Sequence, residues 1–278
     1  MKRTFAFGLV LTVTIWACSR VPISNRKQLL LVSDAEMNQQ ALVSYKQFLD
    51  TNRVVSSSQN AALVKRVGQR IAAAATQYFN DIKHPEFLEG YNWEFNLVED
   101  RQVNAWCMPG GKVVVYTGLL PVTQTEAGLA TVMGHEISHA IAKHGAERVS
   151  QAYVSQGLLV GGQVALGVAM ANRSSQAQNI WNTAYAAAAP AAMNLALLGY
   201  SRQHESEADH LGLIFMAIAG YDPKESITFW QRMANAGKGS QKPPLLLSTH
   251  PSDEQRIEDL RRLVPEAEKF YVAYQNRR

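Results

Sequence analysis

Helical and strand periods alternate along the first half of this chain. The stretch SDAEMNQQALVSYKQFL predicts a capped helix, with Ser33 or Asp34 at its N-cap. Residues 60–79 place apolar side chains three and four positions apart, which predicts a second helix. The expected buried face of this second helix consists of Leu63, Val64, Val67 and Ile71.

Residues 91–100 alternate with a period of two, which predicts a strand with Trp93, Phe95 and Leu97 on one side. A second short strand in VNAWCM is followed by a Pro-Gly-Gly turn and a β-branched strand through Val115. Helical patterns dominate the rest of the chain. We therefore expect an α+β fold with a small mixed sheet and a large helical part.

The most apolar interior stretch is residues 152–171, AYVSQGLLVGGQVALGVAMA. Its glycines predict a helix or hairpin packed closely against another helix, and small residues also suit helix pairing in lipid. Gln156 and Gln163 argue against a membrane span, so we expect a buried helix or a cover over a cleft. After a polar break, residues 184–198 resume an apolar helix that Pro190 interrupts.

The N-terminus has the layout of a secretory signal, because two basic residues precede an apolar run at residues 5–17. This run is shorter than the roughly 20 residues of a membrane span. It leads directly into Cys18 and resembles the bacterial lipobox, although Trp16 stands where a small residue is usual. We expect a lipid on Cys18, and the alternative is an ordinary secretory peptide with an incidental cysteine.

These features predict three regions. Residues 1–17 are expected to be a lipoprotein signal peptide, and residues 18–50 a lipid anchor, tether and docking helix, before a catalytic domain at 51–278. Ser19 replaces the Asp that retains lipoproteins in the inner membrane of enteric bacteria, so we expect a periplasm-facing protein at the outer membrane. With Cys18 acylated, Cys107 would be the one remaining thiol, and no intramolecular disulfide would form.

Composition narrows the class of protein further. The chain has 278 residues, of which 47% are hydrophobic and 18% charged, which excludes a disordered protein and allows one large core. The net charge is +4, and it falls to +2 without the two basic residues of the signal. No long basic run is present, so nucleic acid is not an expected partner.

The segment TVMGHEISHAIAKHG carries the candidate chemistry. On a helix that turns about 100° per residue, His135, Glu136 and His139 fall at roughly 0°, 100° and 40°. Two imidazoles one turn apart can bind one metal ion, and the carboxylate between them can take a proton from a water that the ion polarises. The metzincin continuation would need Gly at 142 and His at 145, but the chain has Ala142 and Gly145.

A third metal ligand is expected in GYSRQHESEADHLGL, residues 199–213. Glu205 and Asp209 are four apart and share a helix face, whereas Glu207 points about 200° away from Glu205. We expect Glu205 to bind the metal and Asp209 to hydrogen-bond a ligand histidine and fix its tautomer. His204 is the competing ligand. His144 and His210 fall off these faces and are expected to be structural.

A di-iron helical bundle is the alternative metal site. It uses Glu-x-x-His pairs, which Glu136 to His139 and Glu207 to His210 would supply. It also needs a Glu from each of two further helices, and the apolar stretches between the two pairs contain no Glu.

The motifs GHEISHAIAKH, YSRQHESEAD and LSTHP occur in the order found in the HtpX-like and CAAX prenyl protease family of gluzincin zinc metallopeptidases. The chain resembles this family from about Asn60 to Leu263, and NAWCMPGGKVVVYTGLL makes it most similar to the BepA-like periplasmic lipoprotein branch. The resemblance implies a zincin-type domain with an HExxH active-site helix, which binds one Zn²⁺ per chain.

The resemblance also implies roles for individual residues. His135 and His139 would bind zinc, Glu136 would act as general base and then general acid, and Glu205 would be the third ligand. His250, in STHP, would lie near the metal, where it would stabilise the oxyanion or occupy the fourth ligand position and inhibit. The substrate would pair with an edge strand in the segment 104–116, beginning with Asn104, Ala105 and Trp106.

The function expected from these features is zinc-dependent endopeptidase activity on misfolded or misassembled cell-envelope proteins, with the membrane bound through Cys18. One alternative is a chaperone-like assembly factor on the same zinc-binding scaffold, with little hydrolysis. A second is a structural lipoprotein whose metal ties two helices together, but a purely structural site has no use for Glu136.

Overall fold

A computed structural model describes residues 18–170, 200–237, 244–250 and 254–276. The chain forms two compact units, which we describe separately. The larger contains residues 22–24, 33–144 and the part from 199 to the C-terminus, and the smaller contains the rest. The signal sequence at 1–17 and the apolar segment at 184–198 lie outside the described residues.

The N-terminal elements of the larger unit follow the expected pattern. Helix α2 (Asp34–Thr51) begins after Ser33, whose side chain forms a reciprocal capping box with Glu36. Helix α3 (Gln59–Asp81) buries Val64, Val67 and Ile71 completely, as its period predicted, whereas Leu63 of the predicted face is only partly buried. A short 3-10 helix, η1 (Pro85–Leu88), follows α3.

The sheet has four strands in the order β3-β4-β6-β5. Strand β3 (Val54–Val55) pairs antiparallel with β4 (Glu94–Val98). Strand β4 pairs parallel with β6 (Lys112–Tyr116). Strand β5 (Ala105–Met108) pairs antiparallel with β6. Between β5 and β6 the expected turn contains Gly110 and Gly111, both at positive φ.

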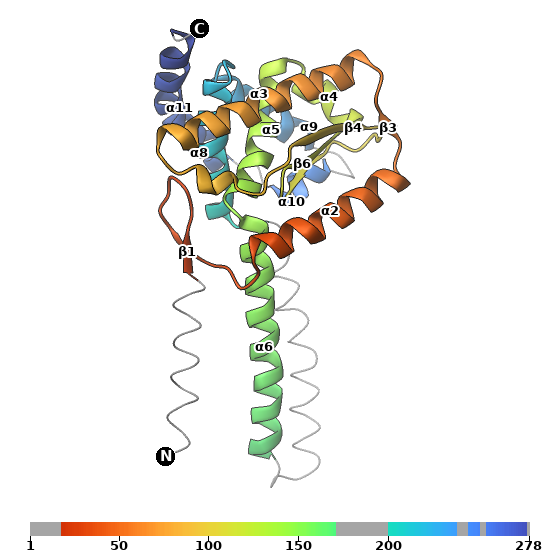
Figure 1. The fold of residues 1–278 in the computed structure, drawn as a ribbon, viewed down its shortest axis with the longest axis vertical. Helices are drawn as coiled ribbons and strands as arrows, with labels where there is room; N and C mark the ends of the chain where they lie inside the picture. Colours follow the sequence, from red (N-terminus) through yellow and green to blue (C-terminus); the bar gives the residue numbers. More distant parts are fainter. Residues whose placement is uncertain (1–17, 171–199, 238–243, 251–253, 277–278) are drawn as a thin grey trace. The chain divides into compact units, whose positions relative to one another are not determined.

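Helices cover both faces of this sheet, so all five residues of β6 are buried. Helix α2 contacts β5 and β6 on one face (Figure 1). Tyr45 of α2 packs there with Val114 and Tyr116. Helix α3 packs against β4 on the other face, where the Phe95 ring lies against Gly68. The prediction of an α+β fold with a small mixed sheet is confirmed.

The remaining helices of this unit surround the α5 helix. After η2 (Thr117–Leu119) and α4 (Leu120–Thr123), α5 (Glu126–Ile141) contacts α3, β5, α8 and α9. Helix α8 (Arg202–Ile218) packs against α11 (Glu254–Gln275), which also contacts α9 (Glu225–Gly237). His250 caps the C-terminus of the short α10 (Leu245–Thr249).

The smaller unit contains a two-stranded hairpin and most of α6 (His144–Met170). Strand β1 (Cys18–Arg20) pairs antiparallel with β2 (Lys27–Leu29). The Arg26 guanidinium donates two hydrogen bonds, of 2.6 and 2.7 Å, to the buried Glu147 carboxylate of α6. Among the helices in the described part of the chain, none is long and apolar enough to cross a membrane.

Candidate metal centre and active site

Helix α5 carries the HExxH motif through the centre of the larger unit. Thr125 caps it by accepting a hydrogen bond from the Gly128 amide, and every residue from Gly128 to Ile141 is buried. His135, Glu136 and His139 are only 2%, 3% and 2% exposed. Buried imidazoles and carboxylates need polar partners, so the question is what satisfies them.

Glycines allow α8 to approach α5 closely enough to supply those partners. A Cβ atom on Gly212 would lie 2.9 Å from the backbone nitrogen of His135, so the two helices touch backbone to backbone. A Cβ atom on Gly134 would likewise lie 3.0 Å from the carbonyl oxygen of Gly212. This crossing places Glu205 and Asp209 of α8 opposite the histidines of α5.

Three of the expected metal ligands converge at this crossing. The Nε2 atoms of His135 and His139 are 3.0 Å apart. The Glu205 carboxylate lies 3.4 Å from Nε2 of His135 and 3.3 Å from Nε2 of His139. Ligand atoms of these three residues and of His250 all lie within 4.8 Å of one another.

The donor set fits a cation. Nδ1 of His135 lies 2.9 Å from an Asp209 oxygen, which as a carboxylate only accepts, so Nδ1 carries the proton and Nε2 a lone pair. That lone pair faces Nε2 of His139 and the Glu205 oxygens in a buried space. A metal ion bound here would satisfy all of these atoms at once.

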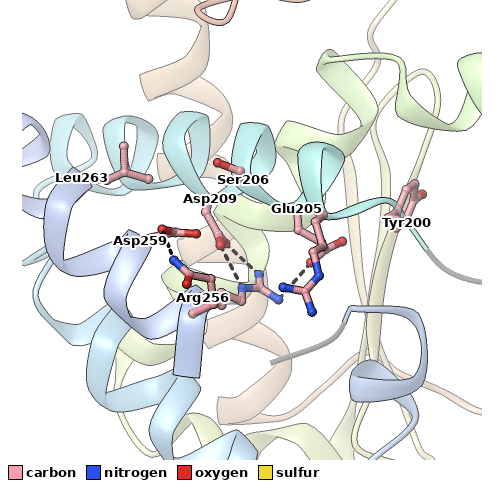
Figure 2. A pocket seen from close by; sticks show the side chains of 9 residues that line it. Tyr200, Glu205, Ser206, Asp209, Arg256, Asp259 and Leu263 are labelled. Carbon is pink, nitrogen blue, oxygen red and sulfur yellow. Dashed lines mark hydrogen bonds and ion pairs between the residues drawn. The ribbon is translucent and has the colours of Figure 1, made fainter. Parts of the chain in front are cut away.

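Arg256 was not predicted from the sequence, and it binds two of the carboxylates of α8, Glu205 and Asp209. Its guanidinium donates bonds of 2.8 and 2.7 Å to Asp209 and lies 2.9 Å from Oε2 of Glu205 (Figure 2). It also stacks on Trp230, with 3.4 Å between Cζ and the ring centroid. An arginine in the charged helix α11 carries no sequence signal of burial, yet Arg256 is only 6% exposed.

A small cavity of about 70 Å³ lies between α8 and α11 beside this cluster (Figure 2). Tyr200, Glu205 and Asp209 line it from one side and Arg256 and Leu263 from the other. Glu205 and Asp209 therefore contact the cavity on one side and the histidines of α5 on the other.

The electrostatic environment shifts the pKa values of Glu136, Glu205 and Asp209 in different directions. Burial raises the pKa of Glu136 to about 7. Burial also opposes ionisation of Glu205 and Asp209, but nearby groups outweigh the effect of burial. His135 lowers the pKa of Glu205, and Arg256 lowers the pKa of Asp209. Glu205 and Asp209 are thus held ionised, as a metal ligand and its supporting carboxylate must be, while Glu136 can exchange a proton near neutral pH.

His250 follows α10 and is 3% exposed. Its Nδ1 lies 2.9 Å from Glu205 and 3.1 Å from Nε2 of His135, and its Nε2 lies 3.4 Å from Glu136. The imidazole therefore lies between the metal-facing carboxylate and the candidate base. This is compatible with either of the two roles that the sequence left open.

Two further histidines, His144 and His204, lie beside the three candidate ligands. His144 is not among the residues that could hold a metal, as expected, but it does not lie away from the site, because its Nδ1 is 2.8 Å from Nδ1 of His139. Helical spacing was the wrong measure, since α5 ends at Ile141 and Lys143 takes a positive φ of 57° before α6 begins. His204, the competing ligand, stacks on His144 at 4.4 Å and is not in the metal-binding group.

The di-iron alternative does not fit this geometry. His210 lies 3.0 Å from Glu266 of α11 and is not in the group of residues that could hold a metal. Glu207 contacts His144. The second Glu-x-x-His pair therefore does not face the first.

The expected substrate strand lies at the edge of the sheet. Strand β5 begins at Ala105 and is last in the strand order, so among the described strands only β6 pairs with it. Asn104 immediately precedes it, and Trp106 lies opposite Val114 of β6. Strand β5 contacts α5. This contact places the edge beside the helix of the HExxH motif. Burial raises the pKa of the Cys107 thiol, and Glu136 raises it further.

Comparison with known proteins agrees with this site. Residues 58–264 match peptidase family M48. A mitochondrial metalloendopeptidase OMA1 of Schizosaccharomyces pombe is 34% identical over 89% of the chain and 67% of its own length. The protein of that name in Saccharomyces cerevisiae is 30% identical over 91% and 70%. A beta-barrel assembly-enhancing protease of Escherichia coli is 30% identical over 76% of the chain and 42% of its own length.

These findings correct the predicted location. The two yeast relatives, which match about nine tenths of the chain, are mitochondrial by name, which contradicts a location at a bacterial outer membrane. Acylation of Cys18 and the domain boundaries at 17 and 50 stay predictions. The expected resemblance holds at the level of the family, since mitochondrial and bacterial relatives match at similar identity. The chain belongs to peptidase family M48 and is a metalloendopeptidase.

Proposed function

We propose that this metalloendopeptidase uses one zinc ion per chain, held by His135, His139 and Glu205, to hydrolyse peptide bonds in unfolded or misassembled polypeptides. The convergence of these three side chains beside a buried glutamate carries the proposal. Two histidines, one carboxylate and an open position form the ligand set of many catalytic zinc sites. When bound, zinc polarises a carbonyl and lowers the pKa of a nearby water.

Glu136 moves the proton in this proposal. Its carboxylate is buried, with its Oε1 atom lacking a hydrogen bond, and burial raises its pKa to about 7. It accepts a proton from the attacking water and then donates it to the amine of the departing product. Asp209 holds the His135 ring through Nδ1, so that Nε2 stays directed at the site.

The free edge of β5 explains how an unfolded substrate would be held. The Asn104 carbonyl already accepts a hydrogen bond from the Tyr116 amide, and backbone groups alternate between the two sides of an edge strand. The backbone groups of Ala105, between Asn104 and Trp106, would therefore bind an extended peptide. Main-chain hydrogen bonds of this kind give affinity with little sequence preference. A folded protein rarely offers an extended segment with free backbone groups. Selection for unfolded or misassembled polypeptides follows from this requirement.

His250 regulates the site in this proposal. Its ligand atom belongs to the same four-residue group as the zinc ligands, so its imidazole would fill the otherwise open fourth position in the resting enzyme. Substrate and water enter when it moves away. In His250→Ala, the rate of peptide cleavage should therefore rise. A loss of cleavage with zinc retained would instead show that His250 assists the reaction.

Digestion of casein by the full chain tests the activity, with zinc, with a chelator and in Glu136→Gln. Removing a positioned general base should lower the rate by about 10²- to 10⁴-fold, while zinc stays bound because the ligands are intact. Glu136→Gln that cleaves at the wild-type rate would contradict the assignment of the base. Cleavage that survives the chelator would contradict the metal.

A chaperone-like assembly factor is the second candidate, and the position of His250 favours it. A fourth protein ligand closes a zinc site and suppresses hydrolysis. Prevention of aggregation of an unfolded protein by Glu136→Gln, as efficiently as by the wild type, would support this candidate. It would be excluded if Glu136→Gln binds zinc but gives no such protection.

A further inference from the structure

The two histidines of α5 obtain their orientation in different ways. Asp209 accepts directly from Nδ1 of His135, at 2.9 Å. For His139, the atom within hydrogen-bonding distance of Nδ1 is another imidazole nitrogen, Nδ1 of His144, at 2.8 Å. One nitrogen of such a pair must carry the proton and the other must accept it, so this contact has two possible directions.

Glu207 decides between these directions. The Nε2 atom of His144 lies 3.0 Å from a Glu207 carboxylate oxygen, which as an anion only accepts. Nε2 of His144 therefore carries the proton, and Nδ1 of the neutral ring has a lone pair. Nδ1 of His139 then donates to it, which leaves the Nε2 lone pair of His139 directed at Glu205 and His135.

The two residues that support His139, which are His144 and Glu207, are buried, and Ser24 holds Glu207 in place. His144 is fully buried and Glu207 is 7% exposed. The other oxygen of Glu207 accepts a 2.7 Å hydrogen bond from the hydroxyl of Ser24, which is 183 residues away in the sequence. His204 stacks on the His144 ring with an interplanar angle of 23°. Neither His144 nor Glu207 belongs to the group that could hold the metal.

The geometry points to His144, oriented by Glu207, as the positioning residue that sets the tautomer of His139. The chain His139–His144–Glu207–Ser24 does for the second histidine what Asp209 does for the first. Its position after the turn at Lys143 makes the start of α6 part of the site's support. This inference rests on the metal site of the proposed function.

Zinc affinity of the full chain tests the inference, measured by competition with a chromophoric chelator. His144→Phe keeps a ring of similar shape but cannot accept from Nδ1 of His139. We expect zinc binding to weaken about 10- to 100-fold, as for other lost supports of ligand histidines. In His144→Gln the side-chain oxygen can accept the same hydrogen bond, so most of the affinity should return. His210→Phe makes the same substitution at a histidine outside the site and should bind zinc as the wild type does.

A second pair of variants covers the case in which His144→Phe fails to fold. Glu207→Met keeps length but loses the acceptor and should weaken zinc binding, whereas Glu207→Gln keeps an acceptor oxygen and should bind nearly normally. Cobalt substitution adds a spectroscopic readout, because a displaced ligand changes the visible absorption bands in His144→Phe and Glu207→Met. A change in packing alone would not be reversed by the glutamine variants.

The outcomes separate this inference from the one it rests on. Zinc binding of wild-type strength in both His144→Phe and Glu207→Met would overturn the role of His144 and leave the metal site standing. Absence of zinc binding by the wild-type chain would overturn the proposed metal site and this inference together. Equal weakening in the glutamine and apolar variants would also overturn it, because the accepted hydrogen bond would then not be the cause.

Discussion

Replacing Gly212 with alanine should separate the two helices that build the site. The added Cβ would lie 2.9 Å from the backbone nitrogen of His135 and 3.0 Å from the carbonyl carbon of Gly134. Favourable contacts between such atoms lie at about 3.5 Å or more, so the helices must part by about 0.6 Å. Backbone atoms cannot rotate away as a side chain can.

Two opposing effects determine how much Gly212→Ala changes the free energy of unfolding. Alanine in a helix is favoured over glycine by about 1 kcal/mol, and overpacking of a tight core costs about 1–3 kcal/mol. Gly157→Ala in α6 supplies the matched control, because a Cβ there meets no atom of the described residues within 4 Å. The control should be as stable as the wild type or more stable, and Gly212→Ala should be about 1–3 kcal/mol less stable than the control.

The same displacement should weaken metal binding. His135 moves with α5 and Glu205 with α8, and metal sites tolerate errors of only about 0.5 Å in ligand position. Urea unfolding and zinc competition on both variants measure the two effects. Gly212→Ala that matches Gly157→Ala in both stability and zinc affinity would refute the reasoning that the glycine crossing sets the site geometry.

Two further predictions follow from the charges and ligands of the site. Arg256→Met leaves the buried carboxylates of Glu205 and Asp209 without their cation, so the free energy of unfolding in urea should fall by about 3–5 kcal/mol; a change below about 1 kcal/mol would contradict the importance of this ion pair. Zinc at 100 times its dissociation constant should stabilise the folded chain by about 2.7 kcal/mol, seen as a rise in the thermal midpoint, and an unchanged midpoint would argue against binding to the folded state.

The local elements were predictable because their signals are local. The cap at Ser33, the buried face of α3 and the Pro-Gly-Gly turn before β6 each depend on neighbouring residues. The HExxH spacing likewise places His135 and His139 on one face of one helix. No tertiary information is needed for features of this kind.

The supports of the site were harder to predict because they depend on where the chain turns. Helical spacing placed His144 away from the site, but the positive φ of Lys143 redirects the chain and returns His144 to His139. Arg256 comes from α11, whose charged sequence resembles a solvent-exposed helix, and its burial depends on Trp230 and α8. Both residues become visible only when distant segments are assembled.

The central claim is that His135, His139 and Glu205 bind one catalytic zinc ion. Diffraction from crystals of the full chain grown with zinc, recorded at the zinc absorption edge, tests this most directly. The account predicts a single strong anomalous peak about 2.0–2.2 Å from Nε2 of His135, Nε2 of His139 and a carboxylate oxygen of Glu205. A peak bound instead by Glu207 or His210, or no peak at this site, would contradict it.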